Sequence, residues 1–169
     1  MRRAPTLAAK AAALPPEGAA PPRGGPSAAR ERFVEGYLGY LLGQANHALY
    51  KDFDAQVRAA GLSSIEWRVL ATLQDSEPLT VSQLARDVLS KQPTVTKLVQ
   101  RMAEQGWLAL QADPADQRRT LVVITAAGRR LVRPLVEKAR AHEATVLRSL
   151  GASEKQALRK LLTKLASQA

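Results

Sequence analysis

The chain of 169 residues contains no cysteine and only two histidines, His47 and His142. The lack of cysteine excludes disulfides, thiolate metal sites and oxidant sensing by a thiol. Neither histidine has a second histidine three or four residues away, so we expect no zinc site and no cofactor. No apolar stretch approaches the roughly 20 residues that would span a bilayer. These absences favour a protein that works without a metal, a cofactor or a membrane.

Catalytic motifs are missing as well. The sequence has no G-x-S-x-G nucleophile elbow, no glycine-rich phosphate loop and no pair of acidic residues in an apolar setting. We therefore expect that the protein is not an enzyme. At this length, a single domain with a proper hydrophobic core is the default.

The net charge of +10 is unevenly placed along the chain. Residues 31–90 carry 5 Lys and Arg against 8 Asp and Glu, whereas residues 91–169 carry 15 against 6. Such a local excess of cations is typical of a surface that faces phosphate groups, although many basic surfaces only aid solubility.

Two helices are indicated before the middle of the chain. The first, over residues 32–60, carries one broad apolar stripe and ends at Gly61. The second opens at Ser63, where Glu66 completes a capping box, and ends near Gln74.

Two further helices are indicated at the C-terminal end. Thr125 caps a long helix that should run to about Leu150 and bend at Pro134. Ser153 and Gln156 form a capping box for the last helix. A lone tail helix would not need the apolar face that this helix carries, so we infer a two-fold homodimer. That face consists of Ala157, Leu158, Leu161, Leu162 and Leu165.

The middle of the chain, residues 79–125, reads as helix, turn, helix, strand, charged loop and strand. Thr80 and Gln83 form a capping box at the start of the first helix. Pro93 suits the first turn of the second helix, which Gly106 ends. Two β-rich runs follow, at residues 107–112 and 120–125, and residues 113–119 between them form the hairpin tip.

The second helix of this unit has a polar face without apolar members. Hydrogen-bonding and cationic side chains match the donors, acceptors and methyl groups that base edges present in a DNA major groove. A solvated helix face would also be polar, but it usually carries Glu–Lys pairs, which are missing here. We therefore predict DNA contact, with Ser82 and Arg86 of the preceding helix meeting phosphates. The predicted recognition residues are Gln92, Thr94, Thr96, Lys97, Gln100 and Arg101.

Three segments of this unit form a recognisable set. They are Leu84-Ala85, Gln92-Pro93-Thr94-Val95-Thr96-Lys97-Leu98 and the wing signature Asp116-x-Arg118-Arg119-x-Leu121-x-x-x-Thr125-x-x-Gly128. Together they resemble the MarR family of winged helix-turn-helix regulators, and the similarity runs from about Tyr37 to the C-terminus. The chain departs from the family pattern at Leu89, in a turn where many members carry glycine.

The resemblance implies a mainly α fold with a small β-hairpin wing. Residues 31–169 would form one MarR-type domain. Residues 62–124 would be its winged helix-turn-helix lobe, and residues 31–61 and 125–169 its long dimerisation helices, interlocked with those of a second copy.

The resemblance also assigns roles to the charged residues of the wing. Arg118 would enter the DNA minor groove, where narrow A·T-rich segments concentrate negative potential, and Asp116 would orient it. Arg119 would meet a phosphate. The alternative is that Asp116 and Arg118 form an ordinary surface ion pair of little energetic consequence.

Polar and aromatic side chains also gather at one flank of the first long helix. One interpretation is a satisfied polar edge of the core. The other, implied by the resemblance, is a pocket for a small aromatic or heteroaromatic carboxylate, with Arg68 pairing with the acid and a ring stacking on Trp67 or Tyr40. The candidate residues are Tyr40, Gln44, His47, Trp67 and Arg68.

Residues 1–30 are rich in Ala, Pro, Gly and Arg and hold almost no large apolar residues. This composition predicts a disordered basic tail, either inert or an arm that touches DNA phosphates. The tail lacks the apolar centre of a secretory signal, so we expect a cytoplasmic bacterial protein.

The sequence therefore predicts a homodimeric transcriptional regulator that binds double-stranded DNA sequence-specifically. We expect a repressor that a small aromatic acid releases from a pseudo-palindromic operator. The alternative is a constitutive or architectural DNA-binding dimer without ligand control.

Overall fold

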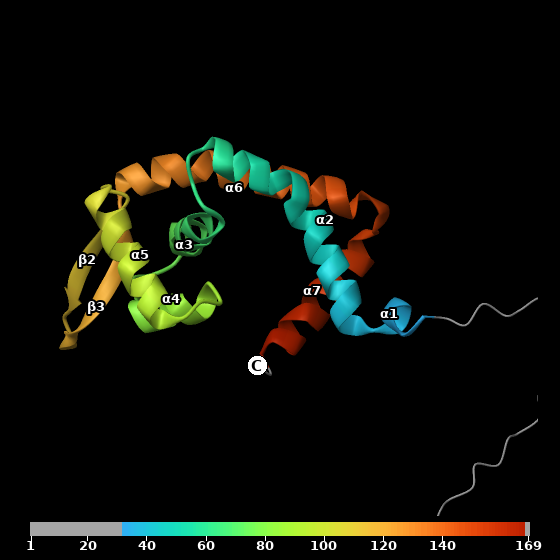
Figure 1. The fold of residues 1–169 in the computed structure, drawn as a ribbon, viewed down its shortest axis with the longest axis horizontal. Helices are drawn as coiled ribbons and strands as arrows, with labels where there is room; N and C mark the ends of the chain where they lie inside the picture. Colours follow the sequence, from blue (N-terminus) through green and yellow to red (C-terminus); the bar gives the residue numbers. More distant parts are fainter. Residues whose placement is uncertain (1–31, 168–169) are drawn as a thin grey trace, which may run out of the picture.

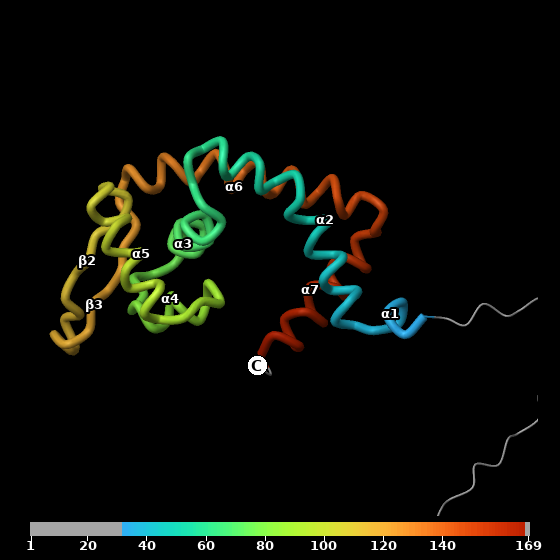
Figure 2. The backbone as a smooth tube through the Cα atoms, in the orientation of Figure 1, coloured from blue at the N-terminus to red at the C-terminus, as the bar shows by residue number. Residues whose placement is uncertain are grey.

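The computed structural model describes residues 32–167, which form a lobe and an arm connected by one long helix (Figure 1). The lobe comprises α3 (Ser64–Gln74), β1 (Leu79–Thr80), α4 (Val81–Asp87), α5 (Gln92–Glu104), β2 (Leu108–Asp113) and β3 (Asp116–Ile124). The arm comprises α1 (Phe33–Gly36), α2 (Leu38–Ala59) and α7 (Ala152–Ala166). The backbone trace shows α6 (Ala126–Val146) running from the wing to the arm, where the 3-10 helix Leu147–Ser149 leads into α7 (Figure 2). The mainly α fold with a small wing is thus confirmed, and the predicted tail lies outside the described residues.

None of the helices in residues 32–167 is both long and apolar enough to cross a membrane.

The wing is a three-stranded antiparallel sheet of order β1-β3-β2. The predicted hairpin is present, but its tip is shorter than expected, because β3 begins at Asp116 and only Pro114 and Ala115 form the turn. Residues 116–119 read as a loop because they are charged, yet a strand with a solvated face needs no apolar residues there. Strand β1, of two residues, was not predicted because so short a segment shows no periodicity.

The first two predicted capping boxes are confirmed. Ser63 Oγ accepts from the Glu66 backbone N–H, and Glu66 Oε2 accepts from the Ser63 N–H at 2.8 Å. Thr80 and Gln83 repeat this arrangement at the start of α4. Both boxes satisfy backbone donors that a helix start leaves unpaired, which fixes where α3 and α4 begin.

The predicted capping box at Ser153 and Gln156 is wrong. Helix α7 begins earlier, after Gly151, whose backbone N–H donates to Glu154 Oε2 at 2.6 Å. A carboxylate in the first turn also interacts favourably with the helix dipole, an advantage that Gln156 could not supply.

The single helix expected over residues 32–60 is interrupted. Helix α1 ends at Gly36, Tyr37 has an extended backbone with ψ of 114°, and α2 starts at Leu38. The Tyr37 ring stacks on Phe33 with a centroid distance of 5.1 Å. The break follows Gly36, and glycine loses more conformational freedom in a helix than any other residue.

The wing signature joins the sheet to α6. Thr125 Oγ1 accepts from the Gly128 N–H at 3.1 Å and donates to the Gly106 carbonyl oxygen at 2.7 Å. A Cβ atom at Gly128 would lie 2.3 Å from the carbonyl oxygen of Trp107, so a side chain there would push the start of α6 off the sheet. Further along, α6 continues through Pro134 as a helix, as predicted.

One hydrophobic core fills the lobe. It is built from α3, α4, α5, the sheet and the first half of α6, and the last turns of α2 contribute Phe53 and Val57. Of the described residues in α1 and α7, none is buried. Large apolar side chains lie exposed on the arm instead, namely Phe33, Tyr37, Leu38, Tyr40, Leu41, Tyr50, Leu158, Leu161, Leu162 and Leu165.

Candidate nucleic-acid interface

A polar groove lies where the starts of α4 and α5 meet strand β3. Its volume is about 540 Å³. Six of the predicted DNA-binding residues line it, although they come from three different elements: Ser82, Arg86, Gln92, Thr96, Arg118 and Arg119. The groove therefore presents hydrogen-bonding groups together with guanidinium groups, the combination that base edges and phosphates require.

Helix α5 is divided into a buried and an exposed face. Val95, Leu98, Val99 and Met102 lie in the core. Thr94, Lys97 and Gln100, three further members of the predicted recognition set, are exposed. At the groove end, Thr96 Oγ1 donates to the Gln92 carbonyl oxygen at 2.9 Å, so this hydroxyl is oriented before any ligand arrives.

The wing arginines are arranged differently from the expectation. Asp116 Oδ2 pairs with Arg119 Nε at 3.3 Å, and Asp116 Oδ1 accepts from the backbone N–H of Arg118 at 3.0 Å. The expected pairing of the Asp116 carboxylate with the Arg118 guanidinium is therefore wrong. Both arginines line the polar groove, and Arg119 is the one whose guanidinium reaches back to Asp116.

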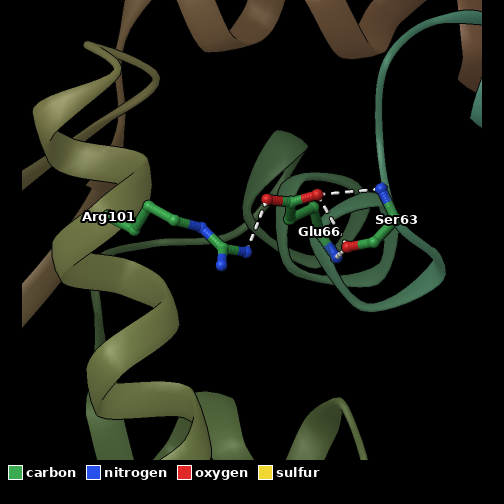
Figure 3. A network of polar contacts seen from close by, with 3 residues as sticks. All are labelled: Ser63, Glu66 and Arg101. Carbon is green, nitrogen blue, oxygen red and sulfur yellow. Dashed lines mark hydrogen bonds and ion pairs between the residues drawn. The ribbon is translucent and has the colours of Figure 1, made fainter.

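Arg101 also departs from its predicted place. It does not line the groove, because it lies on the flank of α5 that faces α3. There its Nη2 donates to Glu66 Oε1 at 2.9 Å (Figure 3). The buried carboxylate needs a cation, and the sequence alone did not show that one was nearby in space.

Glu66 is buried and fully engaged. Burial by itself would raise the pKa of its carboxyl group. Hydrogen bonds from the Ser63 hydroxyl and backbone N–H, together with the hydrogen bond and charge of Arg101, outweigh burial and hold the pKa below its usual range. The ion pair is therefore charged at neutral pH.

The predicted ligand residues are only partly brought together. His47, Trp67 and Arg68 line an open cleft of about 1180 Å³ between α2, α3 and the turn after α4. Tyr40 and Gln44 do not line it, so their assignment to this cleft is wrong. The α2 residues of the cleft begin at Gly43, with Tyr40 almost a turn earlier, and Gln44 projects from the edge of the lining face.

Two features of this cleft favour an anionic aromatic ligand. Within residues 32–167, Arg68 Nε is buried and has no hydrogen-bond partner. Trp67 packs edge to face on Phe53, with a centroid distance of 5.1 Å, which holds the indole rigidly at the cleft wall. Lys51 adds a second cation, whereas Asp54 and Asp87 bring negative charge to the rim.

A second cavity lies behind Trp67, between α2, α3 and α6. It measures about 340 Å³, and its walls are mainly apolar. Tyr50 and Trp67 line both cavities. His142 lines the smaller one with a buried Nε2 that has no partner among the described residues. Sequence reasoning missed both Tyr50 and His142, because Tyr50 stands among other aromatic residues of α2 and His142 is 75 residues from Trp67.

The turn between α4 and α5 contains Leu89, which has φ of +53°. This is the left-handed conformation that glycine adopts freely and that leucine adopts only with strain. The side chain is 86% exposed and lies at the rim of the cleft.

The helix pair, the antiparallel wing and the polar groove between them define a winged helix-turn-helix protein. A family model described as MarR family matches residues 60–119, the central part of this lobe. The MarR family transcriptional regulator SPO1453 from Silicibacter pomeroyi DSS-3 is 37% identical, with a TM-score of 0.70 over 80% of this chain and 99% of that one. The chain belongs to the MarR family and is a DNA-binding transcriptional regulator.

Two further relatives bear on the ligand and on the direction of control. The HTH-type transcriptional repressor NicR of Pseudomonas putida is 29% identical over 128 residues, which cover 76% of this chain and 81% of NicR. The structure of Bordetella bronchiseptica BpsR, described with the regulation of its DNA binding by 6-hydroxynicotinic acid, is 28% identical. Its TM-score is 0.69, over 80% of this chain and 96% of BpsR.

Proposed function

We propose that the protein is a cytoplasmic homodimeric repressor that binds a pseudo-palindromic operator and leaves it when a small aromatic or heteroaromatic carboxylate binds. The groove carries this proposal, because it collects residues of α4, α5 and β3 into one polar surface. Helix α5 enters the major groove with Gln92, Thr96, Lys97 and Gln100 towards the bases. The wing then follows the backbone, with Arg118 in the minor groove and Arg119 at a phosphate.

The exposed apolar faces of the arm support a dimer. Leu158, Leu161, Leu162 and Leu165 repeat on one side of α7, and none of them is buried in the single chain. A two-fold dimer covers such a face with its own copy. It also places two recognition helices one helical turn of DNA apart, which sets half-site centres roughly 10 bp apart.

Repression is supported by two relatives whose names describe them as repressors, NicR and IacR of Pseudomonas putida. A third relative, BadR of Rhodopseudomonas palustris, is named an activatory protein. A promoter–reporter fusion carrying the operator distinguishes the two directions: deletion of the regulator raises expression from a repressed promoter and lowers it from an activated one.

The ligand class follows from the cleft. A carboxylate pairs with the guanidinium of Arg68, which lines the cleft, and an aromatic ring packs against Trp67. BpsR, whose DNA binding is described as regulated by a hydroxylated pyridine carboxylate, supports the same class. Release requires that the acid bind more tightly to a conformer whose two recognition helices are wrongly spaced for DNA, because equal affinity for both conformers shifts nothing.

The DNA-binding part is tested on an operator selected from a random duplex library. Lys97→Ala and Thr96→Ala should weaken the selected operator more than random DNA, and Arg118→Ala should lose affinity chiefly at A·T-rich flanks. Lys138→Ala, which removes one exposed cation from α6, is the matched control for charge. Equal losses on every sequence, or no selected operator at all, would favour an architectural DNA-binding dimer.

The ligand part is tested by DNA release across benzoate-like, phenolic and pyridine carboxylates, with Arg68→Ala and His142→Ala in parallel. We expect at least one acid to release the operator from the wild-type protein and from His142→Ala, and to fail with Arg68→Ala. An unchanged response of Arg68→Ala together with loss in His142→Ala would place the acid in the smaller cavity. If no acid releases the DNA, ligand control is wrong for this class.

A further inference from the structure

Helices α3 and α5 are joined by a polar contact that belongs neither to the groove nor to the cleft. Glu66 of α3 is the buried charged side chain of residues 32–167, at 7% exposure. Its Oε1 accepts from Arg101 of α5, and its Oε2 accepts from the backbone N–H and hydroxyl of Ser63 (Figure 3). We propose that Arg101 is a positioning residue, which acts through Glu66 to set the orientation of α5 and thereby the DNA sequence specificity.

The carboxylate is a fixed anchor. Because Glu66 Oε2 receives two hydrogen bonds from Ser63, at 2.8 and 2.6 Å, the other oxygen has a defined position relative to the first turn of α3. Arg101 reaches that oxygen from α5, 35 residues along the chain. A rotation of α5 about its axis would pull the guanidinium away and leave a buried carboxylate unpaired, which is strongly unfavourable.

The anchor acts on the residues that read DNA. Arg101 lies one position after Gln100 and four after Lys97, so the three side chains are fixed to the same rigid turn of α5. Bidentate contacts with base edges depend on angle as well as distance. A change in the orientation of α5 should therefore weaken contacts with bases more than contacts with phosphates, which tolerate small displacements.

Direct DNA contact by Arg101 is the competing interpretation. Its side chain is 58% exposed, so access alone does not decide the matter. The charge argues against DNA contact, because the guanidinium is already paired with a carboxylate. The two groups together offer a phosphate no net positive charge. The position agrees, since the guanidinium of Arg101 is directed towards Glu66 of α3 (Figure 3).

The experiment compares operator and random duplexes of equal length across a range of salt concentrations, by fluorescence anisotropy. The full-length variants are Glu66→Gln, Arg101→Met, Arg101→Lys and the double variant Glu66→Gln/Arg101→Met. Glutamine keeps an oxygen that can cap α3 but removes the charge. Glu137→Gln and Arg133→Met are the matched controls, because they remove the same charges from an exposed ion pair of α6.

We expect Glu66→Gln and Arg101→Met each to weaken operator binding about tenfold, the effect of one hydrogen bond to a charged group. Random DNA should change less than about twofold, with the salt slope unaltered, because no phosphate contact is lost. The double variant should be no worse than either single one, since both remove the same interaction. Arg101→Lys should keep much of the preference, because the contact uses one nitrogen, and both controls should bind as the wild-type protein does.

Two results would overturn the proposal. In the first, Glu66→Gln binds the operator at least as tightly as the wild-type protein, whereas Arg101→Met loses the same affinity for both duplexes and its salt slope is smaller by about one. That result would mean that Arg101 binds a phosphate. If all variants keep the operator preference and only their thermal midpoints fall, the pair merely stabilises the fold. Should Glu66→Gln fail to fold, the partly exposed Arg101 variants decide alone.

The inference rests on the proposed sequence-specific binding, and the wild-type measurement separates the two. A wild-type protein without operator preference contradicts the proposed function. If the wild-type protein prefers the operator and every variant keeps that preference, only the positioning role of Arg101 is contradicted.

Discussion

Helices α5 and α7 carry the same apolar pattern, but only the apolar face of α5 is buried within the chain. In α5 the residues Val95, Leu98, Val99 and Met102 are all buried. In α7 the equivalent spacing, i, i+3, i+4 and i+7, gives Leu158, Leu161, Leu162 and Leu165, which are between 37% and 65% exposed. Periodicity therefore predicts an apolar helix face, but it does not show whether the same chain buries that face.

This difference in burial separates the lobe from the arm. The lobe and the last turns of α2 share one core, and the groove lies on the lobe. Under the proposed function, one chain therefore reads one half-site. Helices α1 and α7 of the arm have no buried residue among those described. Under the proposed homodimer, they contribute to DNA binding through a second copy. Affinity for a two-fold operator should depend on both parts, and folding of the lobe on one.

The largest effect is expected from equivalent leucines of the two helices. Leu98→Ala in α5 should lower the free energy of unfolding by about 3 kcal/mol, because it leaves a cavity in a packed core. This loss should be the same at every protein concentration. Leu161→Ala in α7 should instead change stability by an amount that depends on concentration, as measured by urea unfolding at two concentrations. A concentration-independent loss of similar size for Leu161→Ala would contradict the division into lobe and arm.

The next effect is the loss of the dimer. Leu161→Asp with Leu165→Asp should give a monomer by light scattering and weaken operator binding about 100-fold, or about 2.7 kcal/mol, because two charges would have to enter the apolar interface. Trp67 in the lobe core should keep its near-ultraviolet signal. Ser153→Asp with Gln156→Asp adds the same charge to the opposite side of α7, and dissociation of that control would mean that charge alone is responsible.

A smaller effect concerns the left-handed turn beside the recognition helix. Leu89→Gly should stabilise the lobe by about 1 kcal/mol, because leucine with φ of +53° is strained and glycine is not. Leu89→Ala also removes most of the side chain but keeps the Cβ atom, so it should not increase the stability of the lobe. Thermal unfolding checks both variants. If glycine destabilises the protein, the exposed Leu89 side chain makes a contact that outweighs its backbone strain.

The smallest effect is the pH dependence of the buried ion pair. The pKa of Glu66 is lowered in the folded protein, so its charged form stabilises the fold above the unfolded value of about 4.3. That contribution is lost as the pH falls below this value, through the folded pKa. The difference in stability between the wild-type protein and Glu66→Gln should therefore be constant from pH 7 to about 5 and shrink under more acidic conditions. A difference that grows on acidification would contradict the direction of the shift.

Local signals in the sequence were sufficient for much of the lobe. The capping boxes at Ser63 and Thr80 depend on residues three positions apart, so the sequence shows them directly. Thr125 and Gly128 work in the same way at the start of α6. The groove was predictable because the residues that line it fall in short motifs, each on one element.

Contacts between distant segments were beyond the sequence. The cation that pairs with Glu66 comes from α5, and residue type alone made Arg101 look like a DNA-binding arginine. In the cleft, Tyr40 and His47 share a stripe of α2, yet only His47 lies opposite α3. Helical spacing predicts the direction in which a side chain points. Which residues it contacts depends on how far the neighbouring helix extends alongside, and the sequence does not show this.

The most direct test of this account is the ratio of operator to random-DNA affinity for the wild-type protein, measured near physiological salt together with the number of chains bound per duplex. Residues of α4, α5 and the wing that read bases, doubled by a two-fold dimer, should give a preference of at least about 1,000-fold with two chains on each operator. A preference below about tenfold, or one chain per operator, would contradict the central claim that the lobe reads sequence and the arm pairs two lobes.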